Sequence, residues 1–448
     1  KEKKTKKLSE IKKMQDYLKD KQKRSGADFV FNIRTIAGHN VMNKISYLYF
    51  QVQPAIKYKQ FMLALDLNLE VHASEYYESP YPAHEVGAVR KEEWSRLAAY
   101  PNKILFLSFG DEYETPIFIH LGRLHDYTLG NGFIIYRYTN SLYYPDMTKT
   151  GIQVKVDFNW IGAEAFCSDV VDLDLFGGRF ILRPFGLTDY KNSIIGKAEV
   201  SYVFVAETDV YDQDRKDGDS YVIYDGSSKI LAHSIDVKIP ILRARSLSLG
   251  AYYSYARIFD KGSGHQFGVN GDFANGLLFY AVEFRIINKG YIAPIISQQW
   301  DAQKKLSYWG SGRNQTIMNH LTTGEQGYSI FIELKNSWFK RKMGFYLTFE
   351  MYIGGETKAN PHLQLGFFMK RGVLSDRVAL RLVLDKVQIS SDNFLVFSNI
   401  FTYFTTEFSV VITPNVEMAV FYIKSFTEDF SGNGMSNELF MLETRITF

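Results

Sequence analysis

The feature that most constrains this chain is an alternation of apolar and polar side chains that recurs in one segment after another. Residues 61–71 read FMLALDLNLEV, and residues 153–160 read QVKVDFNW. Successive side chains of a β-strand point to opposite faces, so each such segment predicts a strand with one apolar and one polar face. Most of the segments span about nine to eleven residues, which is the length that a tilted strand needs to cross a bilayer. Further segments follow at 197–206, 234–240, 246–258, 277–287, 327–335, 343–353, 361–370, 377–387 and 415–425.

The composition favours strands that face water on one side and lipid on the other. Aromatic residues make up 16% of the chain, while hydrophobic residues in total make up only 46%. No segment reaches the ~18 consecutive apolar residues that a membrane-spanning helix requires. Many aromatics, modest hydropathy and no long apolar run together predict a transmembrane β-barrel.

The connections between these segments alternate between short and long, as in a barrel with short periplasmic turns and long external loops. We expect an antiparallel up-and-down barrel of about 20 strands, within a range of 16 to 20. Residues 29–57 and 116–140 are the hardest to assign, and Asn131-Gly132 fits either a tight turn or a loop that folds inward. Short turns are expected at 57–60, 242–245, 288–289, 337–341, 372–375 and 413–415. Longer links are expected near 73–102, 163–176, 207–229, 259–276, 301–326, 354–360 and 427–434.

The final segment has an aromatic terminal residue with apolar residues at alternate positions before it. Phe440, Leu442, Ile446 and Phe448 fit this pattern, and Thr444 departs from it. In this the chain resembles bacterial outer-membrane β-barrel proteins of the porin-like superfamily. The resemblance implies recognition by the barrel-assembly machinery, contact with outer-membrane lipid, and localisation in the outer membrane of a diderm bacterium. An even strand number would place both termini in the periplasm.

Residues 1–28 differ in composition from the barrel expected over 29–448. Residues 1–24 carry eleven Lys/Arg against four Asp/Glu, so the net charge of +3 is concentrated here and gives no reason to expect nucleic acid. Leu8, Ile11, Met14 and Leu18 recur at helical spacing and predict an amphipathic helix in a basic periplasmic tail. The tail would contact an anionic surface such as peptidoglycan, a partner or the barrel lumen, or would remain solvated and partly disordered. The basic start lacks a signal peptide, which is expected if the numbering begins after cleavage.

The polar face of the strands predicts a lumen lined with paired opposite charges. Residues two apart on a strand point to the same side, and balanced pairs would keep the wall polar with little preference for either ion sign. Arg179 and Arg183 would form a track for anions or pair with carboxylates of neighbouring strands. The predicted lining is Asp66, Glu70, Lys155, Asp157, Arg179, Arg183, Lys197, Glu199, Asp236, Lys238, Glu283, Arg285, Glu333, Lys335, Glu350, Arg381, Asp385, Glu443 and Arg445.

Evidence for other chemistry is weak. Asp212, Asp214, Asp217 and Asp219 form an acidic loop that resembles only the start of a calcium-binding loop, and a solvated loop is the alternative. A loop metal site at His120, His125 and Asp126 is a further, weaker option. No nucleotide-binding or catalytic motif is present, so we expect neither an enzyme nor a cofactor.

Three functions fit these features. A porin-like channel would pass small hydrophilic solutes through a charge-balanced lumen. A gated or plugged transporter would carry a specific substrate, such as a hydrophobic compound, past an N-terminal segment. A surface adhesin or structural barrel would act through its long loops. A soluble all-β protein such as a propeller is the remaining fold, and it would stay dispersed without detergent.

Overall fold

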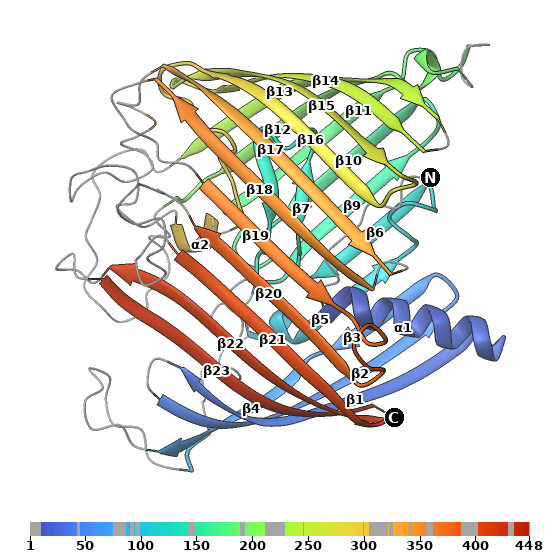
Figure 1. Cartoon of the computed structure of the whole chain (residues 1–448), viewed down its shortest axis with the longest axis vertical. Coiled ribbons are helices and arrows are strands. Elements are labelled where there is room, and N and C mark those ends of the chain that lie inside the picture. The colour runs from blue at the N-terminus through green and yellow to red at the C-terminus, as the bar shows by residue number, and fades with distance from the viewer. Residues whose placement is uncertain are drawn as a thin grey trace.

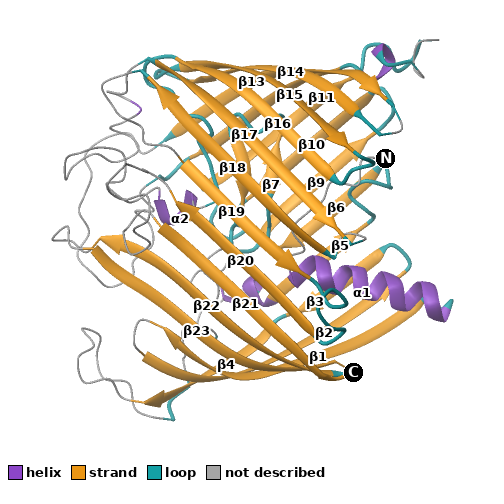
Figure 2. Cartoon of the chain, viewed as in Figure 1, coloured by secondary structure: helices purple, strands orange, loops and turns teal. Residues whose placement is uncertain are grey.

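The structure is a computed structural model of the chain (Figures 1 and 2). Leu8 and Phe448, and the acidic loop Asp212, Asp214, Asp217 and Asp219, lie outside the residues that it describes. The described residues are 10–42, 45–74, 87–89, 94, 99–141, 149–188, 193–210, 229–244, 246–298, 300–303, 321, 326–339, 342–354, 362–386, 402–428 and 434–447.

The dominant element is one closed antiparallel sheet, which confirms the expected barrel. Its 21 segments correspond to twenty strands because β3 and β4 are two parts of one strand that faces β2 in continuous register. The break between them lies next to Pro54 of β2, which has no N–H to donate. The first half consists of β1 (Phe29–Met42), β2 (Ile45–Tyr58), β3 (Phe61–Leu65), β4 (Leu67–Ser74), β5 (Ile104–Phe109), β6 (Ile117–Gly122), β9 (Gly151–Asp157), β10 (Ile161–Cys167), β11 (Leu175–Leu182), β12 (Glu199–Glu207) and β13 (Ile230–Arg243). The second half consists of β14 (Ser248–Ile258), β15 (Ser263–Phe273), β16 (Leu278–Ile287), β17 (Gly327–Trp338), β18 (Met343–Ile353), β19 (His362–Met369), β20 (Val378–Lys386), β21 (Thr402–Thr413), β22 (Val416–Glu428) and β23 (Gly434–Thr447).

The barrel closes where β1 pairs with β23. The pairing is antiparallel and runs from Arg34 opposite Thr447 to Met42 opposite Leu439. Every described strand of the wall therefore has neighbours on both sides, and the closed sheet has no free edge along this seam.

The alternation in the sequence separates the two faces of the wall. On β13, Leu231, Ile235 and Ile239 are 40–46% exposed, whereas Ser234 and Asp236 are buried. The apolar residues point outward and the polar residues point into the barrel, the reverse of a soluble protein. Such a wall is stable only if its outer surface meets lipid.

The connections differ in three places from those expected. Residues 259–276, expected to form a long loop, contain the whole of β15, with short turns before and after it. Asn288-Lys289, expected to be a short turn, instead begins a long connection from Ile287 to Gly327. Both errors arise because the apolar stretch near Ile292 mimics a strand, whereas the outward face of β15 includes His265 and Gly271 and so is only partly apolar in the sequence. Part of the link expected at 163–176 also belongs to β10 and β11.

A helix precedes the barrel and packs on its inner wall. Helix α1 (Glu10–Ser25) buries Ile11, Met14 and Leu18. These side chains belong to one apolar cluster with Val30, Ala55, Met62, Ala64, Leu105 and Phe106 of the wall. Figures 1 and 2 show α1 at the end of the barrel that carries the C-terminus and the short turns. Of the possibilities stated for this segment, contact with the barrel lumen corresponds to the packing of residues 10–25.

Two further segments fold into the barrel. One, at 123–141, connects β6 to β9 and contains the two-stranded sheet of β7 (Tyr127–Leu129) and β8 (Ile135–Tyr138). The other begins after β16 and ends with the short helix α2 (Trp300–Gln303). Together we call residues 123–141, 291–298 and 300–303 the inner plug; residues 288–290, directly after β16, are not part of it. Among the described residues, no helix is long and apolar enough to cross a membrane.

Candidate functional site: the inner plug and the vestibule

The inner plug has an apolar core of its own. Its two segments join through a parallel bridge between Ile135 and Ile296, with a hydrogen bond of 3.0 Å from the Tyr136 amide to the Ile296 carbonyl. The Phe133 and Tyr291 rings lie 5.2 Å apart, and the Tyr291 hydroxyl donates to the Phe133 carbonyl. These side chains are nearly inaccessible to solvent, and apolar residues near the long-connection ends of several strands surround them. In this part of the lumen, packed side chains replace water.

Charged and polar residues of the wall hold the plug in place. The Tyr136 hydroxyl donates a hydrogen bond of 2.6 Å to Glu333 of β17. The backbone amide of Asn131 donates to Asp236 of β13 at 3.2 Å. The lumen-facing carboxylates at these two positions are therefore bound to the plug itself. Asn131-Gly132 is a turn of the inward segment, which is one of the two arrangements left open by the sequence.

Arg137 connects the plug to a third part of the wall. Its guanidinium forms an ion pair with Asp126 at 2.6 Å and donates to Gln364 of β19 at 2.6 Å. Gln364 also donates to Asp385, which contacts His362 at 2.6 Å. Burial opposes ionisation of Asp126, but the charge of Arg137 outweighs it and lowers the pKa of that carboxyl well below its usual range. The pair therefore remains charged at neutral pH.

Arg285 forms a deeply enclosed ion cluster in the wall. It is 1% exposed, and its guanidinium contacts Glu283 of the same strand and Glu350 of β18, the latter at 2.6 Å. The same guanidinium reaches the Ala293 carbonyl of the plug at 3.4 Å. Tyr252 extends across Gly268 and donates to Glu283. A side chain at Gly268 would collide with the Tyr252 ring, so the glycine is needed for this contact.

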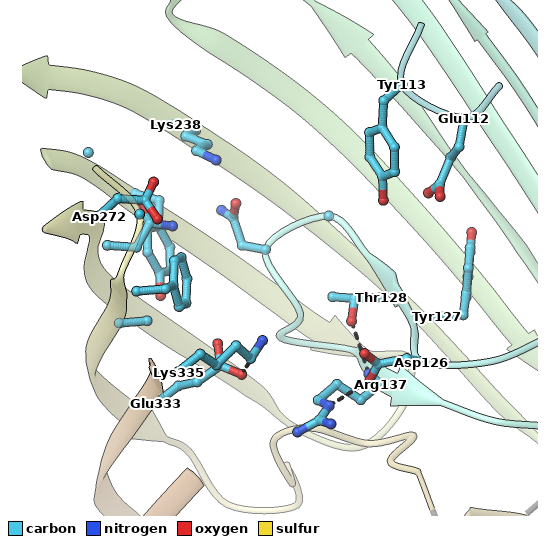
Figure 3. A pocket seen from close by; sticks show the side chains of 18 of the residues that line it. Glu112, Tyr113, Asp126, Tyr127, Thr128, Arg137, Lys238, Asp272, Glu333 and Lys335 are labelled. Carbon is cyan, nitrogen blue, oxygen red and sulfur yellow. Dashed lines mark hydrogen bonds and ion pairs between the residues drawn. The ribbon is translucent and has the colours of Figure 1, made fainter. Parts of the chain in front are cut away.

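A cavity of about 940 Å³ lies between the plug and the short turns, and we call it the vestibule. Figure 3 shows Glu112 and Tyr113 projecting into it from one side, and Lys238 and Asp272 from the other. The plug closes the vestibule on the side of Asp126 and Arg137. Its nine Lys/Arg and eight Asp/Glu are nearly balanced: Lys19, Arg123, Arg137, Lys155, Arg179, Lys197, Lys238, Arg243 and Lys335 against Asp111, Glu112, Asp126, Glu164, Glu199, Asp272, Glu283 and Glu333.

The two arginines considered as an anion track are paired with carboxylates. Arg179 forms an ion pair with Glu199, and Arg183 contacts both Asp157 at 2.6 Å and Glu199 at 3.1 Å. The four side chains come from β9, β11, β12 and the residue after β11, so the network ties three strands together. Pairing across strands was the alternative to the anion track, and this geometry corresponds to it.

The other residues expected in the lining have varied surroundings. Glu283/Arg285, Glu333/Lys335 and Glu443/Arg445 form ion pairs within their strands, and Arg445 also contacts Glu407 at 3.3 Å. Asp66 binds Arg123, Gln51 and Gln53, and Glu70 is buried. Lys155 lies over the Tyr113 ring, and Lys238 lines the vestibule. Lys197 also lines it, but from a short 3-10 helix rather than from a strand. Arg381 and Asp385 share β20, where Asp385 contacts His362 and Gln364.

The remaining predicted positions belong to the terminal strand and to the possible metal site. Phe440 and Leu442 are exposed on the outer wall, and Ile446 pairs with Thr35 in the closing seam. His120 and Asp126 have separate partners, at the Arg123 carbonyl and Arg137. The described residues contain no group of three or more His, Cys, Asp or Glu that fits a metal ion.

Sequence reasoning missed the residues of the plug. Phe133, Ile134, Ile135, Ile295 and Ile296 are apolar residues in connecting segments, which are usually polar and exposed. Apolar residues in a connecting segment were therefore the signal in the sequence that could have revealed the plug. Their partners lie on distant strands, so the alternation within any one strand carries no trace of them.

Comparisons with known proteins add little. No family model and no curated protein matches the chain. Similar solved structures include OpdQ of Pseudomonas aeruginosa, with 8% identity, TM-score 0.36, and coverage of 94% of this chain and 97% of that one. A BenF-like porin of Pseudomonas fluorescens Pf-5 has 6% identity, TM-score 0.37, and coverage of 94% and 99%. CdiB of Acinetobacter baumannii has 7% identity and TM-score 0.28, with 93% of this chain and 60% of that chain covered.

At these values none of the matches carries an argument about the function of this chain. The structural assignment rests on the molecule itself: strand closure between β1 and β23, an apolar exterior and a polar interior. A closed antiparallel barrel of this kind is the architecture of the bacterial outer-membrane β-barrel superfamily.

Proposed function

We propose that the protein is a porin-like outer-membrane channel for small hydrophilic solutes, and that the inner plug gates it. The observation that carries this proposal is the vestibule, a cavity of about 940 Å³ with charges of both signs. A polar cavity that opens toward the short-turn end of a barrel suits a hydrated, polar solute better than an apolar one. We place the short turns and both termini in the periplasm.

The charge balance predicts weak selectivity between cations and anions. Most of the charged residues that line the vestibule form an ion pair, as in Arg179–Glu199 and Lys335–Glu333. Paired charges keep the wall wet but present little net field to a passing ion. Solute size, limited by the plug, would then decide what passes.

Single-channel recording in planar bilayers tests this proposal. We expect brief conductance steps from the wild type and longer openings after Tyr136→Phe/Asn131→Ala. This double variant removes the Tyr136 hydroxyl and also the Asn131 side-chain amide, which donates to Ser254 of β14 at 3.0 Å. The reversal potential in a salt gradient should lie near zero. Absence of steps at every voltage, in both the wild type and the double variant, would rule out the channel.

A second function, a plugged transporter for a specific substrate, is supported by the apolar core of the plug. A packed core that interrupts the lumen is unusual for a passive pore and suits a device that opens only when substrate binds. This alternative predicts no ion conduction even from the double variant, together with saturable substrate uptake into proteoliposomes. No adhesive or catalytic role is proposed.

A further inference from the structure

Basic side chains gather on the outer wall at the end of the barrel that carries the long connections. Arg257 is the only charged residue on the outward face of β14, where the other outward positions are Leu249, Ala251, Tyr253 and Tyr255. An arginine that faces lipid is strongly destabilising at the midplane of a bilayer and nearly neutral at its interfaces. Its place one residue before the end of β14 therefore indicates the level of the lipid headgroups.

Neighbouring strands add two histidines and three lysines around Arg257. His233 of β13 lies directly opposite it in the strand register. His265 of β15 lies diagonally across, two residues from Ser263, which is the partner of Arg257. Three exposed lysines flank these strand ends, and the backbone of one of them, Lys289, lies against Gly262 of the β14–β15 turn. We call the set the basic cluster: Lys229, His233, Arg257, Lys261, His265 and Lys289.

Aromatic rings form the floor of the basic cluster. His233 stacks on Phe259 with centroids 5.0 Å apart and planes 25° apart. His265 lies 5.1 Å from the Tyr255 ring and accepts or donates a hydrogen bond of 2.9 Å with the Tyr253 hydroxyl. Aromatic residues of this kind mark the interface of a membrane protein. The Nδ1 atom of His233 has no hydrogen-bond partner among the described residues, although it is buried against the wall.

The charge of this surface is strongly one-sided. Within the described outward faces of β13–β16 and the β14–β15 turn, Asp260 is the only carboxylate. The inner face of the wall differs, because carboxylates there pair with arginines. An excess of basic side chains beside an aromatic floor fits a phosphate monoester or diester, which accepts several hydrogen bonds and carries negative charge.

We propose that the basic cluster binds the phosphorylated headgroup of a lipid in the outer leaflet of the outer membrane. Arg257 would hold the phosphate, with the lysines supplying further charge and His233 a hydrogen bond, while the acyl chains lie along the apolar wall below. The proposal rests on the orientation proposed above, with the long connections outside, but it does not depend on conduction.

Native mass spectrometry of the full chain in detergent can test this site. The probes are diphosphorylated lipid A, dephosphorylated lipid A and inorganic phosphate alone. The test variant is Arg257→Ser/Lys289→Ser. The matched control, Arg377→Ser/Lys23→Ser, removes two exposed charges at the short-turn end. We expect the wild type and the control to retain diphosphorylated lipid A, and the test variant to bind it roughly tenfold more weakly.

The outcomes distinguish a lipid phosphate from free phosphate, and the lipid site from the channel. Equal retention of the phosphorylated and dephosphorylated lipids, or equal weakening by both double variants, overturns the proposal. Binding of inorganic phosphate as tight as that of the lipid would identify a free-phosphate site instead. If the test variant loses lipid binding but keeps the conductance of the wild type, the basic cluster is a site separate from the channel. Intact lipid binding in a protein without conductance would refute the channel and leave the cluster standing.

Discussion

The hydroxyl of Tyr136 lies 2.6 Å from Glu333, and this contact joins the plug to the wall across almost two hundred residues of sequence. Glu333 also accepts from Lys335 at 2.7 Å, so one carboxylate serves both an ion pair of the wall and an anchor of the plug. The polar lining of the barrel therefore has two roles, because residues that line the vestibule also bind the inner plug.

Replacing Tyr136 with Phe should loosen the plug without unfolding the barrel. The lost hydrogen bond to a charged group stabilises the closed arrangement by about 1.5–3 kcal/mol, so the open probability should rise roughly tenfold or more. Single-channel recording measures it. Tyr280→Phe removes a hydrogen bond to the Ser248 carbonyl in the wall and serves as the control. Unchanged gating by Tyr136→Phe would contradict an anchoring role.

Removing Arg285 should destabilise the barrel strongly. Glu283 and Glu350 would be left as buried, unpaired carboxylates, at a cost of about 3–5 kcal/mol. We expect Arg285→Met to lower the temperature at which the folded band disappears in a heat-modifiability gel. The triple variant Glu283→Gln/Arg285→Met/Glu350→Gln should recover most of the loss, because no buried charge remains. A triple variant as unstable as the single one would argue that packing, rather than charge, sets the effect.

Helix α1 should restrict access to the vestibule. Leu18 is fully buried in the apolar cluster, and Met62 on the wall lines both that cluster and the vestibule. In a Met62→Cys background, Leu18→Asp should detach the helix and speed labelling by a charged maleimide at least several-fold. Tyr17→Asp, at a position 42% exposed, should leave the rate unchanged. The buried Cys167 must first be replaced by Ala, because it would otherwise react in the unfolded fraction.

Acid should not release the plug until the pH is very low. The Arg137 charge holds the pKa of Asp126 below its ordinary value, despite burial, which acts in the opposite direction. A carboxyl whose folded pKa is lowered stabilises the fold above its unfolded pKa, near 4, and this contribution disappears only as the pH falls through the folded pKa. Gating of the wild type should therefore stay constant from pH 7 to about 5, whereas Asp126→Asn should gate more often at pH 7. A steep opening of the wild type between pH 7 and 5, absent in Asp126→Asn, would refute this assignment.

The wall was predictable from the sequence and the plug was not. Strands such as β17 and β18 follow from alternation alone, since lipid and water impose opposite demands on the two faces of each strand. Ion pairs two residues apart, such as Glu333–Lys335, follow from the same periodicity. Arg183 contacting Glu199 depends on strand register, which alternation leaves open.

The plug depends on contacts that are distant in sequence. Ile135 meets Ile296 inside the lumen, and neither lies in a segment with a regular period. The stretch near Ile292 therefore suggested a strand after a short turn, whereas it is part of the plug. Connecting segments with many apolar residues are the place to look for such elements in other barrels.

The seam between β1 and β23 has a consequence for the order of assembly. Both inward segments lie between these two strands in the sequence, so both can fold into the curved sheet before the seam forms. If the barrel closed first, the apolar core of the plug would have to enter it unpacked and pass the polar side chains of the lumen. We therefore expect the plug to form before the wall closes, and an error in the plug should appear as a failure of β1 to pair with β23.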